Sequence, residues 1–183
     1  VSTLNNLAAL LFILPYFIFS ATAGQIADKY ERSQLVRGIK ILEIVIMLIG
    51  SAGFILGHLW LLLLALFLMG THSTFFGPIK YAILPEILKP NELMSGNALF
   101  QSGTSIAILL GMILGGAVIS TSQGNLIWIS LTVVIIAVFG YFSSRFVLKQ
   151  NVTSPDLKID WNFFRTSFQT LKYAKSLPIV FLI

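Results

Sequence analysis

Two ionisable residues, Glu43 and His72, occur within stretches of sequence that are otherwise almost wholly apolar. If these stretches cross a membrane, a charge inside them is costly, so each residue is a candidate functional residue. Glu43 can pair with a cation at Lys40 or Arg37, and a shared proton would link it to Asp28. His72 can act as a neutral packing residue or as a proton carrier, because histidine changes charge near neutral pH. The sequence leaves these alternatives open.

A second group of polar residues follows along the chain. Lys80 is placed to meet an anionic group, to pair with Asp28 or Glu86, or only to mark the membrane surface. Asn97 and Gln101 are four residues apart and therefore share one face of a helix. That face either lines a cavity or forms hydrogen bonds with a neighbouring helix.

Several kinds of chemistry are excluded by what the sequence lacks. The chain has no cysteine, which excludes disulfides and thiolate metal sites within it. Its histidines are not grouped with metal spacing, neither begins a His-x-x-x-x-Asp acyltransferase signature, and no phosphate-binding loop is found. We therefore expect a protein that is not an enzyme and that uses no metal or other cofactor.

The composition indicates a membrane protein. Hydrophobic residues make up 56% of the chain and charged residues 10%, whereas a soluble domain has about 25% charged residues. Mean hydropathy is +0.89. The net charge of +5 does not indicate a nucleic-acid partner, because the basic residues flank apolar stretches. That arrangement is typical of membrane topology.

The apolar stretches divide into membrane-spanning helices of about 20 residues. Residues 44–79 would form roughly 54 Å of helix, which is too long for one crossing, so we expect a turn at Gly57 and His58. Residues 93–144 must fold back too, and Ser120 to Asn125 have turn composition. The first span is predicted to end near Ala23, and the others to cover about 39–57, 59–80, 94–119 and 126–145, with a sixth beginning near Leu177.

All 12 Lys and Arg residues fall into three connections on the same side of this arrangement. Loops rich in Lys and Arg face the cytoplasm. The sequence therefore predicts an all-α integral membrane protein whose charged loops are cytoplasmic. Apolar residues reach both ends of the chain, so we expect a piece of a longer protein.

The first charged loop carries the sequence GQIADKYER, residues 24–32. It resembles the signature loop of the major facilitator superfamily, approximately G-x-x-x-D-[RK]-x-G-[RK]. Gly24, Asp28, Lys29 and Arg32 occupy motif positions, and Glu31 stands where the family usually has glycine. The resemblance implies a gating role, in which Gly24 lets helix ends approach closely. Asp28 would cap a facing helix or pair with Arg32.

The resemblance also implies a domain organisation. Residues 1–145 correspond to the N-terminal transmembrane half without its first helix, residues 146–176 to a cytoplasmic linker, and residues 177–183 to the start of helix seven. The linker contains a helical stripe with a predicted N-cap at Asp160. We interpret it as an interfacial amphipathic helix that joins the two halves or binds lipid headgroups. The stripe consists of Trp161, Phe164, Phe168 and Leu171.

A narrower resemblance extends over residues 77–88, 92–116 and the linker. These segments are similar to bacterial lysophospholipid transporters, including forms fused to an acyltransferase. The resemblance implies secondary transport of a lysophosphatidylethanolamine-like lipid across the inner membrane for reacylation, with a fused or separate acyltransferase as partner. Alternatives are a carrier of a drug or sugar, or the membrane domain of a fused acyltransferase.

Gly103, Gly111 and Gly115 are expected to form a close-packing face.

Overall fold

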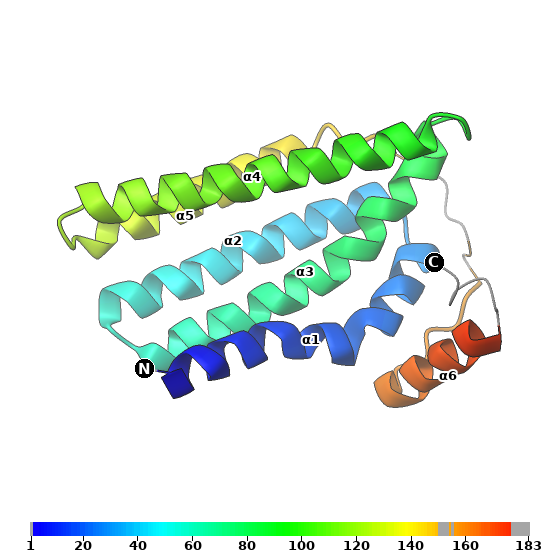
Figure 1. Ribbon diagram of the computed structural model, residues 1–183, viewed down its shortest axis with the longest axis horizontal. Coiled ribbons are helices and arrows are strands. Elements are labelled where there is room, and N and C mark those ends of the chain that lie inside the picture. Colours follow the sequence, from blue (N-terminus) through cyan, green and yellow to red (C-terminus); the bar gives the residue numbers. More distant parts are fainter. Residues whose placement is uncertain (1, 150–153, 155, 177–183) are drawn as a thin grey trace.

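The computed structural model describes residues 2–149, 154 and 156–176, and all of its regular structure there is helical (Figure 1). This confirms the predicted fold class. The sixth span, predicted from Leu177, lies outside the described residues. The helices are α1 (Ser2–Lys29), α2 (Arg32–Leu56), α3 (Leu59–Ile87), α4 (Leu93–Thr121), α5 (Leu126–Ser144) and α6 (Phe163–Ser176).

Helices α1 to α5 are each long and apolar enough to cross a membrane. Both predicted turns are confirmed. Gly57 adopts the left-handed conformation (φ 65°), and the His58 amide bonds to the Gly53 carbonyl at 3.0 Å, as in a Schellman cap. Gln123 and Gly124 also have positive φ angles, which reverse the chain between α4 and α5.

Three helices extend several residues beyond their predicted spans, and α2 begins at Arg32 rather than near residue 39. The first was expected to end near Ala23 but continues to Lys29, and the third was expected to end at Lys80 but continues to Ile87. The extensions of α1 and α3 pack against neighbours, since Ala27 and Leu84 are buried. Packing among helices therefore maintains the helical backbone past the apolar stretch, which hydropathy alone does not show.

Four of the long helices form the packed part of the molecule. Helix α3 packs against α1 and α2, and α2 also packs against α5. Helix α4 stands apart, with smaller contacts to α3 and α5 (Figure 1) and no buried residue. A Cβ added at Gly103, Gly111 or Gly115 would meet no atom within 4 Å. The predicted close-packing role of these glycines is therefore wrong among the described residues.

The charged ends of the helices meet at one end of the bundle. Ala27 of α1, Val36 of α2 and Ile79 of α3 form a buried apolar cluster, and Val147 from the segment after α5 packs against it. These positions lie near the loops that carry the Lys and Arg residues. The structure thus groups the three basic connections on one side, as the charge pattern predicted.

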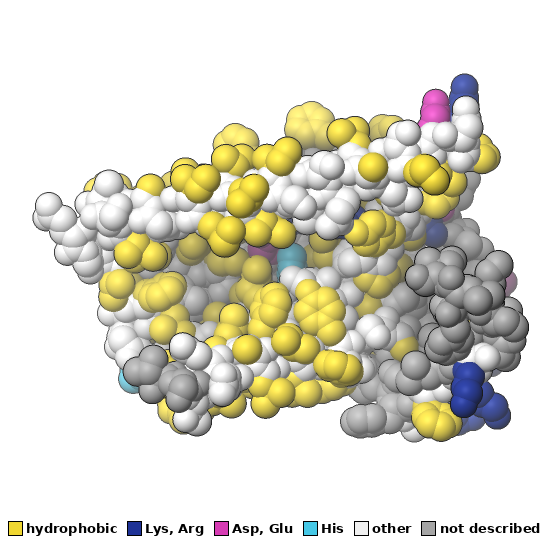
Figure 2. All heavy atoms as spheres, viewed as in Figure 1, with side chains coloured by type: hydrophobic (Ala, Val, Ile, Leu, Met, Phe, Trp, Pro, Cys, Tyr) yellow, Lys and Arg dark blue, Asp and Glu magenta, His cyan; other side chains and the backbone are white. Residues whose placement is uncertain are grey.

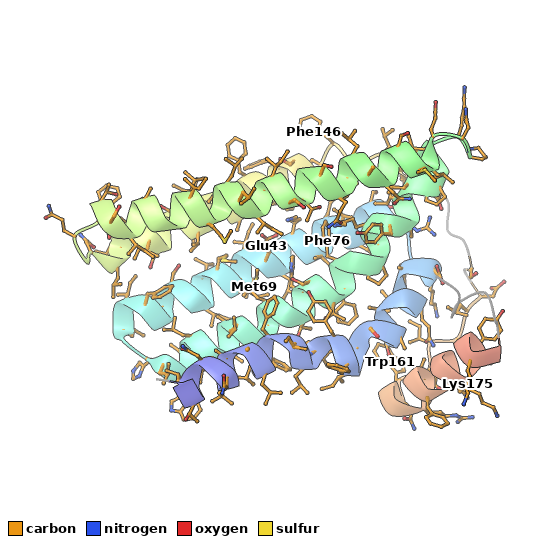
Figure 3. The ribbon with its side chains drawn as sticks, in the orientation of Figure 1. Glu43, Met69, Phe76, Phe146, Trp161 and Lys175 are labelled. Atoms are coloured by element: carbon orange, nitrogen blue, oxygen red, sulfur yellow. The ribbon has the colours of Figure 1, made fainter. Side chains whose placement is uncertain are left out.

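Helix α6 packs beside α1 at this end (Figures 1 and 3). The Asp160 amide donates to Gln25 Oε1 at 3.0 Å, and the Ser154 amide donates to the Asp28 carbonyl at 3.0 Å. Asp160 was predicted as the N-cap, which is wrong by two residues. Asn162 Oδ1 accepts from the Arg165 amide at 3.1 Å and caps the helix.

The stripe predicted for this helix is only partly described. Trp161 precedes α6, because Asp160 Oδ1 accepts from the Asn162 amide at 2.9 Å and forms a turn there. Phe168 is exposed. The side chains of Phe164 and Leu171 lie outside what the structure describes.

Candidate functional site

The start of α2 is held by two carboxylates. Glu31 is the N-cap, and its side chain accepts from the amides of Ser33 at 2.9 Å and Gln34 at 3.1 Å. Arg32 is buried and forms an ion pair with Glu86 of α3. A cation at a helix N-terminus is unfavourable, and both carboxylates offset that effect. Glu31 thus replaces the family's glycine with a side chain that begins the helix.

The structure also describes the surroundings of the other motif residues. Asp28 does not pair with Arg32, since Arg32 pairs with Glu86. The Asp28 side chain is exposed, and Glu31 caps the N-terminus of α2. A Cβ on Gly24 would meet nothing within 4 Å, so Gly24 makes no close helix approach among the described residues. Lys29 Nζ lies 5.8 Å from the centre of the Tyr30 ring.

The close approach of helices occurs instead at Gly70. A Cβ there would overlap the carbonyl oxygen of Phe12 and lie 3.2 Å from Pro15 Cγ. Helices α1 and α3 therefore touch backbone to backbone at this position, as small residues allow in membrane proteins. Gly70 belongs to no motif, and its role could not be found from the sequence.

Lys80 links α3 to α4 rather than to a carboxylate. Its Nζ donates to Thr104 Oγ1 at 3.2 Å and lies 5.0 Å and 5.2 Å from the ring centres of Tyr81 and Phe100. Thr104 Oγ1 in turn donates to the Phe100 carbonyl. Among the described residues Lys80 forms no ion pair with Asp28 or Glu86, and Glu86 pairs with Arg32.

Gln101 joins the same pair of helices. Its Oε1 accepts a hydrogen bond from the Tyr81 hydroxyl at 3.1 Å. Of the two predicted roles for Asn97 and Gln101, bonding to a neighbouring helix is therefore confirmed for Gln101. Asn97 is exposed on α4.

An apolar cavity of about 350 Å³ opens beside Lys80. Residues from α2, α3, α4 and the segment after α5 form its wall, and Lys80 is the one charged side chain among the described residues that line it. The apolar lining includes Val36, Phe76, Ile83, Ile87, Phe100 and Phe146. A cavity of this kind suits a ligand that combines a hydrocarbon part with one negative charge.

A separate ionic group lies between α2 and α3. Lys40 Nζ donates to Glu43 Oε2 at 2.6 Å, which confirms the predicted pairing with Lys40 over those with Arg37 and Asp28. The same carboxylate oxygen lies 3.4 Å from His72 Nε2. The sequence identified Glu43 and His72 as separate candidates but did not reveal that they meet.

The face seen in Figure 2 shows where this group lies. A hollow runs between the ridge formed by α4 and the helices below it, and a histidine and an acidic side chain are visible in the hollow. Figure 3 places Glu43 along α2, with Phe76 farther toward the charged end of the bundle. No group of three His, Cys, Asp or Glu residues that could hold a metal ion occurs in the part of the chain that is described.

Five apolar helices with polar residues between them define a multi-pass membrane protein. The family model of the Major Facilitator Superfamily matches residues 2–183. The chain therefore belongs to this superfamily of transporters.

Curated relatives are longer than this chain and match only part of it. The chain is 30% identical over 110 residues to the lysophospholipid transporter LplT of Cronobacter sakazakii and to that of Escherichia coli O1:K1, and 31% identical over 108 residues to that of Pectobacterium carotovorum. The matches cover 57–58% of this chain and 24–25% of each relative. The matched part of the chain thus spans about a quarter of the length of these relatives. No solved structure gives a significant match.

Proposed function

We propose that the chain is part of a secondary transporter that moves a lysophospholipid, such as a lysophosphatidylethanolamine-like lipid, across the bacterial inner membrane. Transport would occur by alternating access, in which two halves rock around a central site. The transported lipid would be reacylated by a fused or separate acyltransferase. We propose no catalytic role for this chain.

The observation that carries this proposal is the apolar cavity with a single cation. A lysophospholipid has one acyl chain and one phosphate. The cavity of about 350 Å³ offers aromatic and aliphatic side chains together with the Lys80 ammonium. Lys80 makes no ion pair with any described carboxylate, so its charge is available to an anionic group. The names of the curated relatives agree with this substrate class.

The proposed transporter has three parts within this chain. Residues 1–145 would be the larger part of an N-terminal half, and residues 146–176 a cytoplasmic linker whose α6 lies at the membrane surface. Residues 177–183 would begin the next helix. The motif residues Gly24, Asp28, Lys29 and Arg32 would belong to a cytoplasmic gate, to which the Arg32–Glu86 pair contributes. Asn97 is a further candidate for contact with the lipid.

Substitution of Lys80→Gln tests the proposal, because it removes the charge and nearly keeps the length of the side chain. In proteoliposomes containing the full-length protein, we expect uptake of labelled lysophosphatidylethanolamine to fall at least tenfold, which corresponds to about 1.4 kcal/mol. The matched control is Lys89→Gln, because Lys89 is exposed in the loop between α3 and α4. It should transport at the wild-type rate.

Two results would contradict the proposal. If the wild-type protein moves no lysophospholipid but moves a drug or sugar, the substrate class is wrong. If Lys80→Gln transports lysophospholipid with wild-type rate and affinity, the lipid is a substrate but Lys80 does not bind it. Equal losses with zwitterionic and anionic lysolipids would indicate that Lys80 contacts the phosphate rather than the variable headgroup.

A further inference from the structure

Three ionisable side chains from two helices meet around one carboxylate oxygen. Glu43 Oε2 is 2.6 Å from Lys40 Nζ and 3.4 Å from His72 Nε2. The side chains of Lys40, Glu43 and His72 are 20%, 15% and 7% exposed. Neither ring nitrogen of His72 has a hydrogen-bond partner of good geometry among the described residues. The imidazole therefore has unused capacity to hold a proton.

The depth of this group argues against a role at the membrane surface. Glu43 is 13 residues before Leu56 and His72 is 13 residues after Leu59, so each lies about 20 Å from the outer end of its helix. About 10 Å of a ~30 Å hydrocarbon core then remains on the charged side. Both helices are long enough to cross the bilayer, so the group lies well inside it. Ionisable residues at this depth are rare, face other protein groups and mark ion or proton paths.

The group can change its charge without leaving a cation unpaired. With His72 neutral, the Lys40–Glu43 pair has no net charge. A proton taken from hydronium onto the free ring nitrogen makes His72 an imidazolium, and the carboxylate can accept from both cations because it has about four lone-pair sites. The Phe76 ring also stabilises the positive charges of this group. It stacks on His72 with ring centres 6.1 Å apart, and its centre lies 5.3 Å from Lys40 Nζ.

We propose that Lys40, Glu43 and His72 form a proton-binding site within the membrane, in which His72 takes up the proton and Glu43 holds the imidazolium. The reaction moves one proton from hydronium to the imidazole nitrogen, and no other bond changes. Proton binding does not depend on which solute is carried. Its coupling to lysophospholipid movement rests on the proposed function.

The surrounding helices bring no other charge into this group. Arg37 precedes it on α2, and α4 has no titratable residue. None of the remaining titratable residues on the helices that pack against α2 and α3 forms an ion pair or a hydrogen bond with Glu43 or His72 in the described structure. These residues are Tyr16, Asp28 and Lys29 on α1, Lys80, Tyr81 and Glu86 on α3, and Tyr141 and Arg145 on or next to α5.

The test measures protons directly on the full-length protein in detergent. After a step from pH 8 to pH 5.5, a pH-sensitive dye reports the protons bound. We expect His72→Phe, which keeps an aromatic ring beside Phe76, to bind about one proton fewer per molecule than wild type. The control His58→Phe changes the exposed histidine in the outer turn. It should leave transport unchanged.

Transport separates the two histidines and the two proposals. In proteoliposomes, we expect His72→Phe and Glu43→Gln to exchange lysophosphatidylethanolamine at equilibrium but to lose at least tenfold of the uptake driven by a pH gradient. Unchanged proton binding in His72→Phe would overturn the site, and so would unchanged gradient-driven uptake in both variants. If His72→Phe does not fold, gradient-driven uptake in Glu43→Gln decides, and unchanged uptake in that variant would overturn the site. A wild type that shows the His72-dependent proton but moves no lysophospholipid would contradict only the proposed substrate.

Discussion

Substitution of Gly70→Ala should destabilise the protein through the contact between α1 and α3. The added Cβ would overlap the Phe12 carbonyl oxygen. Cβ atoms in proteins essentially never approach another heavy atom within 3.0 Å. The atom in the way is backbone, so no side-chain rotation relieves the overlap and α1 must move away from α3.

The magnitude follows from the balance of two effects. Overpacking in a packed interior costs about 1–3 kcal/mol, and the higher helix propensity of alanine returns up to about 1 kcal/mol. We therefore expect a net loss of about 1–2 kcal/mol, a factor of roughly 5–30 in the folded-to-unfolded ratio. Tryptophan fluorescence during denaturant unfolding in detergent measures this change.

Gly77→Ala is the matched control, because Gly77 lies on the same helix and a Cβ there would meet nothing within 4 Å. Its stability should be equal to or slightly above that of wild type. If Gly70→Ala and Gly77→Ala shift the unfolding midpoint equally, the close approach of α1 and α3 is wrong.

Two further predictions concern the charged end of the bundle. Glu86→Gln should lower stability by about 1–3 kcal/mol, because it removes the negative charge that pairs with the buried Arg32 guanidinium. Asp28→Asn should keep the stability and slow transport if Asp28 belongs to the gate. Equal melting temperatures for Glu86→Gln and wild type would contradict the predicted loss of stability. A wild-type transport rate in Asp28→Asn would contradict the role of Asp28 in the gate. For topology, a cysteine at Gln123 should react with an impermeant thiol reagent applied to intact cells, and one at Asn91 should not. Labelling of Asn91→Cys from outside would show that the predicted orientation is wrong.

The sequence by itself determined the helices and the side on which their charges lie. In a bilayer the backbone must satisfy its own hydrogen bonds, so a long apolar stretch with a turn signal leaves little choice but two helices. This is why the turn at Gly57 and His58 and the turn predicted within Ser120 to Asn125 were predicted correctly. The Lys and Arg distribution is likewise a property of the sequence alone, and it predicted which loops share one side.

Only the tertiary structure decided which residues meet. Glu43 and His72 are on different helices, and their contact depends on how far α2 and α3 are rotated and shifted against each other. The same holds for Arg32 with Glu86 and for Lys80 with Thr104. The rotation and shift result from all the packing contacts together, including the backbone approach at Gly70. Local sequence contains no information about a neighbour's rotation, so it identified the ionisable residues but not their partners.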